Sequence, residues 1–212
     1  MNKIIVDKEK VLKLNSDEIL LEIRTKKVAI NIQGQVVIND LSNNEELEMT
    51  INIDSNSSLV YNNFAKGKIN NSVIINQNSN SILIYNYSIL VQEKSFFKID
   101  ANIKSNNINC EINVKAVTKE QGSLEIIATG DIVPNIKKIK YLENLRILAL
   151  NDEENIIIPN LFVSSNNLEA LHNATISRPS KEEIFYLTSK GLSSKKAQDL
   201  IMRGYLINNL KL

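Results

Sequence analysis

The sequence predicts an all-β chain that ends in a short helical region, and three observations support this prediction. Apolar and polar residues alternate in short runs between Lys27 and Asn166, clusters of Asn and Ser separate the runs, and a helix-start pattern follows Pro179. Strict alternation is typical of half-buried strands, because successive side chains leave a strand on opposite faces. Many short strands without helices leave three architectures open: a β-sandwich, a β-barrel or a β-solenoid.

The strands can be followed in order along the chain. Residues 1–26 carry mixed charges, and the segment SDEILLEIRTK is compatible with either a short helix or a first strand. From Lys27 the alternation is clear in VAINIQGQVVIND and ELEMTINID, and it continues in NSVIINQNSNSILIYNYSILVQ, SFFKIDANIKSNNINCEINVKAVT, SLEIIATGDI and LRILAL. Strands are therefore expected about every 8–12 residues. Asn and Ser suit the corners because their side chains bond nearby backbone groups.

The scarcity of glycine favours the solenoid among the three architectures. The chain has 6 Gly and no Asn-Gly or Asp-Gly pair, although those pairs are what two-residue hairpin turns prefer. A solenoid turns its corners with Asn and Ser and stacks similar residues in successive coils. No regular sequence period accompanies the strands, so the repeat pattern alone does not identify a solenoid.

Two short helices are expected after Pro179. Ser180 and Glu183 have the spacing of a capping box, and Gly191 marks the end of the first helix. A second helix should begin at Ser193 or Ser194, bury an apolar face and end at Gly204. Helices of roughly ten residues are not stable alone, so they must pack on the strands or on a partner protein.

Bulk composition limits the classes of partner. The 212 residues carry a formal net charge of +1, whereas phosphate backbones are bound by concentrated basic surfaces. The one local basic cluster, residues 137–140, is interpreted as a solvated face rather than a nucleic-acid patch. The N-terminus has no apolar run of signal-peptide or membrane-spanning length. A cytoplasmic protein without nucleic-acid or membrane partners is expected.

Residues with possible chemistry are few. The single cysteine, Cys110, excludes an internal disulfide and is expected to be a small buried residue within a strand. The only histidine, His172, is by itself more typical of a structural residue. No nucleophile elbow or glycine-rich phosphate loop is present, and the acids of NDEEN are interpreted as a polar turn. A carbohydrate-active β-helix enzyme would need more paired acids than these. The protein is therefore not expected to be an enzyme.

An ordered series of motifs between residues 129 and 206 resembles the C-terminal part of the SufB/SufD family, the scaffold proteins of the SUF iron–sulfur cluster assembly system. The series covers a little over a third of the chain closely. Residues 27–128 resemble the family only in the general character of their sequence. Its parts are two apolar strands around a proline, the His-Asn-Ala-Thr turn, an acidic helix start and a final helix: Leu145–Leu150, Pro159, Leu161–Val163, His172–Thr175, Glu183–Leu187, Ser189–Leu192 and Leu200–Leu206.

The resemblance implies a right-handed parallel β-helix followed by helices that dock the ABC-type ATPase SufC. On this basis the chain divides into an N-terminal segment (residues 1–26), a β-helix core (27–178) and a helical SufC-docking region (179–212). A homodimer, or a heterodimer with a SufB/SufD-like subunit, is implied as well. The residues expected at the SufC contact are Phe185, Tyr186, Leu200, Arg203 and Tyr205.

The resemblance also suggests which residues handle a transient iron–sulfur cluster. His172 matches the family histidine implicated as a ligand in SufD-like members, with Asn173 in place of the usual glycine. Glu153 aligns with a cysteine of SufB-like members, and Ala170 replaces a cysteine found in some SufD members. A sulfur acceptor would then have to be Cys110. The resemblance implies a short member of the family, closer to SufD, which is expected to lack the family's N-terminal helical region. An alternative is a structural or regulatory homo-oligomeric solenoid that docks the ATPase without binding iron.

Overall fold

The computed structural model describes residues 2–166 and 168–209 and places thirteen strands before two helices in that part of the chain. The strands are β1 (Asn2–Val6), β2 (Val11–Ile23), β3 (Lys27–Asp40), β4 (Glu46–Ile53), β5 (Ser58–Gly67), β6 (Asn70–Gln77), β7 (Ser81–Val91), β8 (Ser95–Ile103), β9 (Ile108–Thr118), β10 (Leu124–Ile132), β11 (Ile139–Ala149), β12 (Ile156–Val163) and β13 (Glu169–Ser177). The helices are α1 (Lys181–Ser189) and α2 (Ser194–Ile207).

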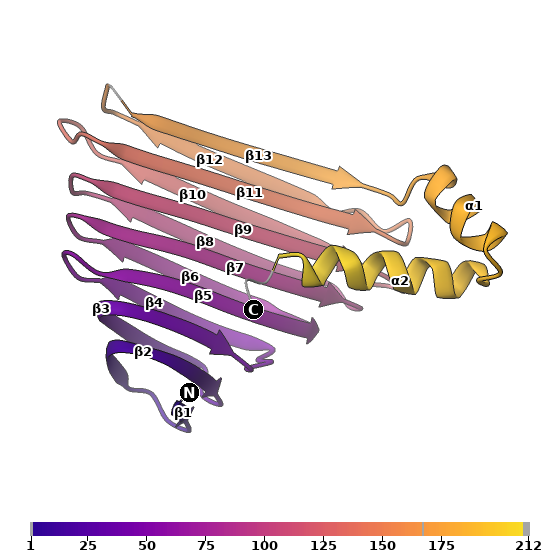
Figure 1. Cartoon of the computed structure of the whole chain (residues 1–212), viewed down its shortest axis with the longest axis horizontal. Coiled ribbons are helices and arrows are strands. Elements are labelled where there is room, and N and C mark those ends of the chain that lie inside the picture. The colour runs from indigo at the N-terminus through magenta and orange to yellow at the C-terminus, as the bar shows by residue number, and fades with distance from the viewer. Residues whose placement is uncertain (1, 167, 210–212) are drawn as a thin grey trace.

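The strands form a parallel β-helix. The strand order is β12-β10-β8-β6-β4-β3-β5-β7-β9-β11-β13, so even-numbered strands stack on one side and odd-numbered strands on the other (Figure 1). Each coil contributes one strand to each side. β3 joins the two sides, because residues 27–32 pair with β4 and residues 35–40 pair with β5. The expected parallel β-helix followed by a helical region is confirmed.

The N-terminal residues belong to the same stack of coils. β2 pairs with β3 along most of its length, and β1 pairs with the second half of β2. The segment that was compatible with a helix or a strand is therefore strand. Val6, Leu12 and Leu21 of this first coil are buried, whereas Ile5 and Val11 are exposed.

Inward-facing side chains fill the interior with the alternation seen in the sequence. β8 alternates strictly between buried and half-buried residues, and the interior is mostly Ile, Val and Leu. Tyr61 and Tyr85 stack in neighbouring coils with ring centroids 4.9 Å apart. The hydroxyl of Tyr61 donates to the Asp40 carboxylate, which also accepts from the backbone and hydroxyl of Ser42. Burial raises the pKa of Asp40 above its ordinary value despite these donors.

Asparagine side chains form ladders between coils. On the outer face of the odd-numbered strands, the ladder starts at Asn39, which accepts from Asn62. Each later Asn amide donates to the Asn carbonyl oxygen of the preceding coil; the donors are Asn62, Asn86, Asn113, Asn144 and Asn173. A second set stacks at the corners, where Asn56, Asn80 and Asn107 all have φ near +60°. Asn tolerates this left-handed conformation better than most residues. In the next coil, Lys138 has a φ of +59° at the corresponding corner.

The two helices begin as expected, but α2 ends later than expected. Ser180 and Glu183 form the capping box of α1, and Ser193 caps α2. α2 continues through Gly204 to Ile207, so the predicted end at Gly204 is wrong. Met202 and Leu206 bury against Leu90, Val117 and Leu148 of the odd-numbered strands. This packing outweighs the cost of glycine in a helix, which is about 1 kcal/mol.

Side-chain hydrogen bonds fix the end of α2 to the strands. The Ser88 hydroxyl donates to the carbonyl oxygen of Leu206 at 2.9 Å, and the Asn209 amide donates to the carbonyl oxygens of Tyr87 and Asn113 at 3.0 and 3.1 Å. α1 lies beyond the strands at the far end of the helical arm. Neither helix, within the described residues, combines the length and apolar character needed to cross a membrane.

Candidate functional site

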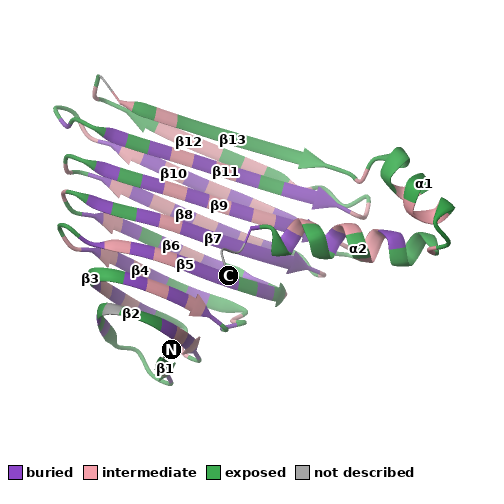
Figure 2. Ribbon diagram, in the orientation of Figure 1, coloured by how far each residue is buried: buried purple, intermediate pink, exposed green. Residues whose placement is uncertain are grey.

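The two ends of the β-helix differ in how well their interiors are covered. At the C-terminal end, within the part of the chain that the structure describes, β12 pairs only with β10 and β13 only with β11, so each has one unpaired edge. β13 is exposed along nearly its whole length, as Figure 2 shows. Large apolar side chains are exposed on these two strands: Ile156, Ile158, Phe162, Val163, Leu171 and Ile176. Exposed apolar residues on unpaired edges are typical of an association surface.

His172 lies on the inward side of this open end. Strand register places Ile112, Glu143 and His172 above one another in three successive coils. Ile112 and Glu143 point into the interior and are buried, each 1% exposed. His172 shares their side of the sheet but has no coil above it, so its side chain is exposed. The sequence-predicted ligand therefore faces the space where a partner would complete the interior.

Glu143 is a buried carboxylate with one unsatisfied atom. Its Oε2 atom accepts a hydrogen bond of 2.7 Å from the Tyr141 hydroxyl, whereas its Oε1 atom has no partner among the described residues. Burial raises the pKa of Glu143, and the Tyr141 hydrogen bond and the nearby His172 partly oppose this effect. An unpartnered buried acceptor is costly, so a site of this kind indicates a ligand or a functional role.

A glycine in the neighbouring sheet makes room for Tyr141. A Cβ atom at Gly130 would lie only 2.7–2.8 Å from three atoms of the Tyr141 ring and hydroxyl. Since Tyr141 holds Glu143, Gly130 contributes indirectly to the position of the carboxylate. Sequence analysis did not identify Glu143. Its signal was present, because a Glu occupies an inward position of the alternating strand Tyr141–Leu145.

The other two predicted ligands lie elsewhere. Cys110 is fully buried, as expected, and pairs in register with Tyr141 one coil nearer the N-terminus. Burial raises the pKa of its thiol, with smaller contributions from Glu143 and Glu111. Glu153 lies in the corner before β12, on the rim of a hollow that Lys68, Lys94 and Glu154 also line. The described residues contain no group of three or more His, Cys, Asp or Glu side chains placed to hold a metal ion.

The predicted partner-binding residues are mostly accessible. α1 buries none of its residues, and Phe185 and Tyr186 are 73% and 61% exposed. On α2, Leu200 is 52% exposed and Arg203 is also exposed. Tyr205 differs, because it is half-buried against the cluster beneath α2 and lies under the Lys115 ammonium group, 5.6 Å from the ring centroid.

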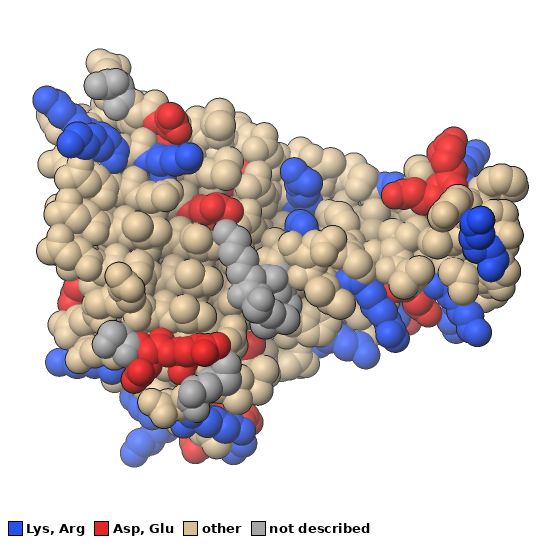
Figure 3. Space-filling model, in the orientation of Figure 1, with Lys and Arg blue, Asp and Glu red and all other residues tan. Residues whose placement is uncertain are grey.

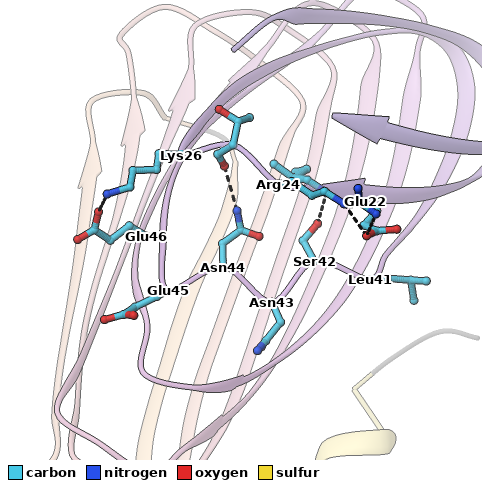
Figure 4. A pocket seen from close by; sticks show the side chains of 11 residues that line it. Glu22, Arg24, Lys26, Leu41, Ser42, Asn43, Asn44, Glu45 and Glu46 are labelled. Atoms are coloured by element: carbon cyan, nitrogen blue, oxygen red, sulfur yellow. Dashed lines mark hydrogen bonds and ion pairs between the residues drawn. The ribbon is translucent and has the colours of Figure 1, made fainter. Parts of the chain in front are cut away.

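A further hollow of about 540 Å³ lies near the N-terminal end and is shown in Figure 4. Its charged groups compensate one another. Arg24 pairs with Glu22 at 2.7 Å, and Lys26 pairs with Glu46. Ser42 and Asn44 bond the backbone beside them. With its charges and amides already satisfied, this hollow offers no group that demands a ligand.

Comparison with known proteins gives one consistent result. Residues 21–205 match the family model described as "SUF system FeS cluster assembly, SufBD core domain". Three similar curated proteins are called iron-sulfur cluster assembly SufBD family proteins. They come from Methanothermobacter thermautotrophicus (32% identity over 99 residues), Pyrococcus horikoshii (37% over 87) and Archaeoglobus fulgidus (32% over 112). The alignments cover 46%, 41% and 52% of this chain but only 24%, 20% and 30% of those proteins.

Proposed function

Because the chain belongs to the SufBD family of the SUF iron–sulfur cluster assembly system, we propose that it is a non-enzymatic scaffold subunit of such an assembly complex. The single observation that carries this role is the position of His172 on an end coil whose interior is uncovered. A cluster assembled there would be cargo, held transiently and passed on. The scaffold is proposed to act in the cytoplasm.

The donors at this end suit iron better than sulfur. Imidazole nitrogen and carboxylate oxygen are both iron ligands in proteins, and His172 lies directly above the unsatisfied Glu143 carboxylate. Neither group can carry a persulfide. Cys110 is the only thiol of the chain, and its complete burial keeps it from a sulfur donor. Sulfur would therefore be supplied through a partner.

Two partners are proposed. The first is a SufC-like ABC ATPase that docks on α1 and α2, supported by the exposed aromatic side chains Phe185 and Tyr186 and by the exposed residues Leu200 and Arg203. Tyr205 supports that surface from beneath rather than forming its outer face. The second partner is an identical or a different SufB/SufD-like subunit that covers the open end and adds ligands to His172.

The test is anaerobic co-expression with a SufC-like ATPase, followed by purification and an absorption spectrum. A brown complex is expected, and His172→Ala should remove most of the colour, whereas Thr175→Ala, outside the interior on the same strand, should not. A stable but colourless wild-type complex would instead support the alternative, a structural solenoid that docks the ATPase without binding iron.

Docking is tested separately by co-purification. Phe185→Asp and Arg203→Glu should each release the ATPase. The first replaces an aromatic ring of the proposed contact with a carboxylate, and the second reverses a positive charge there. Lys181→Glu, at the exposed start of α1, is a charge-reversal control. If both test variants keep the ATPase bound, the C-terminal helices are not its docking surface.

A further inference from the structure

A small polar pocket lies on the outer face of the odd-numbered strands, where the end of α2 meets β9 and β11. Its volume is about 260 Å³, and its walls are mostly side-chain amides of the asparagine ladder and of the two residues after α2. Three charged side chains line it: Lys115, Arg146 and Glu111. Figure 3 shows basic side chains at this junction of the sheet and the helical arm, beside a largely uncharged central area of the sheet.

The two cations form an unusual cross-strand pair. Lys115 and Arg146 lie directly opposite one another in the register of β9 and β11. Like charges in this relation are destabilising. Elsewhere the sheet pairs opposite charges, as in Lys27 with Glu48 at 3.1 Å and Lys140 with Glu169 at 3.9 Å. Within the described residues, no carboxylate lies within ion-pair distance of Lys115 or Arg146.

Lys115 is partly buried, whereas Arg146 is exposed. Burial lowers the pKa of Lys115, and the neighbouring Arg146 lowers it further. Among the described residues, the Lys115 ammonium group has the face of Tyr205 as its partner. An anion between the two cations would offset both effects, and the planar Arg146 guanidinium can hold an oxyanion through two parallel hydrogen bonds.

The remaining polar groups suit a phosphoryl group. The Asn144 amide donates one hydrogen to Asn113 and keeps its second hydrogen free of partners among the described residues. The Glu111 carboxylate accepts one hydrogen bond, of 2.8 Å, from Asn113. A carboxylate can accept a further hydrogen bond from a P–OH group, which a phosphoryl group retains near neutral pH and a sulfate ion lacks.

We propose that this pocket binds a phosphate-class oxyanion, as the free ion or as the terminal group of a nucleotide, through Lys115, Arg146 and Asn144, with Glu111 selecting the protonated form. The site is independent of the proposed scaffold role. It lies outside the β-helix interior, whereas His172 faces the interior at the open end.

The test is titration calorimetry on the full chain at about pH 6.5, where phosphate monoesters are partly protonated. Inorganic phosphate should bind at one site, and sulfate should bind more weakly. Arg146→Gln and Lys115→Gln should each weaken phosphate binding about tenfold or more, as expected for a lost charge-assisted hydrogen bond. Lys140→Gln is the matched control, because Lys140 lies on the outer face of β11, the strand that carries Arg146. This variant should bind phosphate normally.

Three further measurements sharpen the result. Glu111→Gln should bring the affinities for phosphate and sulfate together. Arg146→Lys should bind phosphate with intermediate affinity, because it keeps the charge and loses the paired hydrogen bonds. ADP that binds more tightly than phosphate would identify a nucleotide as the source, and equal affinities would identify the free ion. Absence of phosphate binding, unchanged binding by Arg146→Gln, or equal wild-type affinity for sulfate would overturn the proposal.

Discussion

Glu143 lies directly beneath His172 in the stack of coils, and its Oε1 atom accepts no hydrogen bond from the described residues. The two side chains are 29 positions apart in sequence and neighbours only because β11 and β13 pair in parallel. Tyr141 fixes one carboxylate oxygen and leaves the other unsatisfied. The interior of the β-helix thus ends in a polar pair at the end that no further coil covers.

Gly130→Ala should destabilise the fold by about 1–3 kcal/mol, the usual cost of overpacking a core. The new methyl group would collide with the Tyr141 ring. Urea unfolding of Gly130→Ala, Tyr141→Val and the double variant measures the coupling. The double variant should be more stable than the sum of the two single effects predicts. Strict additivity would show that the methyl group is accommodated without moving Tyr141.

Asn86→Ala should destabilise the protein by about 2–4 kcal/mol, because it removes two ladder hydrogen bonds from a buried position. Asn86 is 1% exposed and connects Asn62 with Asn113. Asn173→Ala is the control: this residue is exposed, donates only to Asn144, and should cost less than about 1 kcal/mol. Equal losses in chemical denaturation would mean that burial does not strengthen the ladder.

Lys138→Asn should stabilise the protein by about 0.5–1 kcal/mol. The backbone at Lys138 is in the left-handed region, in register with the corner residues Asn56, Asn80 and Asn107. Asn is less strained there and can donate to the Asn107 side chain. The melting temperature should rise for Lys138→Asn but not for Lys137→Asn, whose neighbouring position does not require a positive φ. A fall for Lys138→Asn would contradict the strain argument.

Asp40→Asn should change how stability depends on pH. Burial raises the folded-state pKa of Asp40 above its value in the unfolded chain. The stabilisation from Asp40 is therefore fully present below the unfolded pKa of about 4 and is lost as the pH rises through the folded pKa. Urea unfolding at several pH values should show wild type losing more stability than Asp40→Asn as the pH rises. Parallel profiles would show that Tyr61 and Ser42 fully offset the burial.

Ser180→Ala should weaken ATPase docking without lowering global stability. Ser180 forms the capping box with Glu183, and the loss of such a cap costs a helix about 1 kcal/mol. α1 buries no residues, so its fraying leaves the β-helix intact. Titration of the ATPase against the variant should show reduced affinity at an unchanged melting temperature. Ser180→Asp retains a capping acceptor and should restore binding.

The strands and helix starts could be predicted from sequence because their signals are local. Ile30, Ile32 and Ile51 are buried as their alternation required, and Ser180 caps α1 as its spacing from Glu183 required. The coil repeat could not be found as a period. Successive ladder asparagines are separated by 23, 24, 27, 31 and 29 residues, because the corners vary in length.

The candidate site was only partly predictable from the sequence, because it depends on contacts between coils. His172 was identified through a motif, but its neighbour Glu143 depends on the register between coils, which no local pattern specifies. The continuation of α2 past Gly204 likewise depends on burial of Leu206 against strands far earlier in the chain, including β7, whose Ser88 lies 118 positions before it. Tertiary contacts decided these features, whereas local propensity decided the strands and caps.

The different coverage of the two ends limits how copies of such a chain can assemble. A stack that used both ends would be a head-to-tail contact, and head-to-tail contacts that do not close into rings grow into fibres. Here the inward-facing Leu12 and Leu21 of the first coil are buried, whereas Ile176, on the inward side of the last coil, is 47% exposed. Copies that associate only through the open end would therefore stop at a pair, which protects a strand-rich protein against polymerisation.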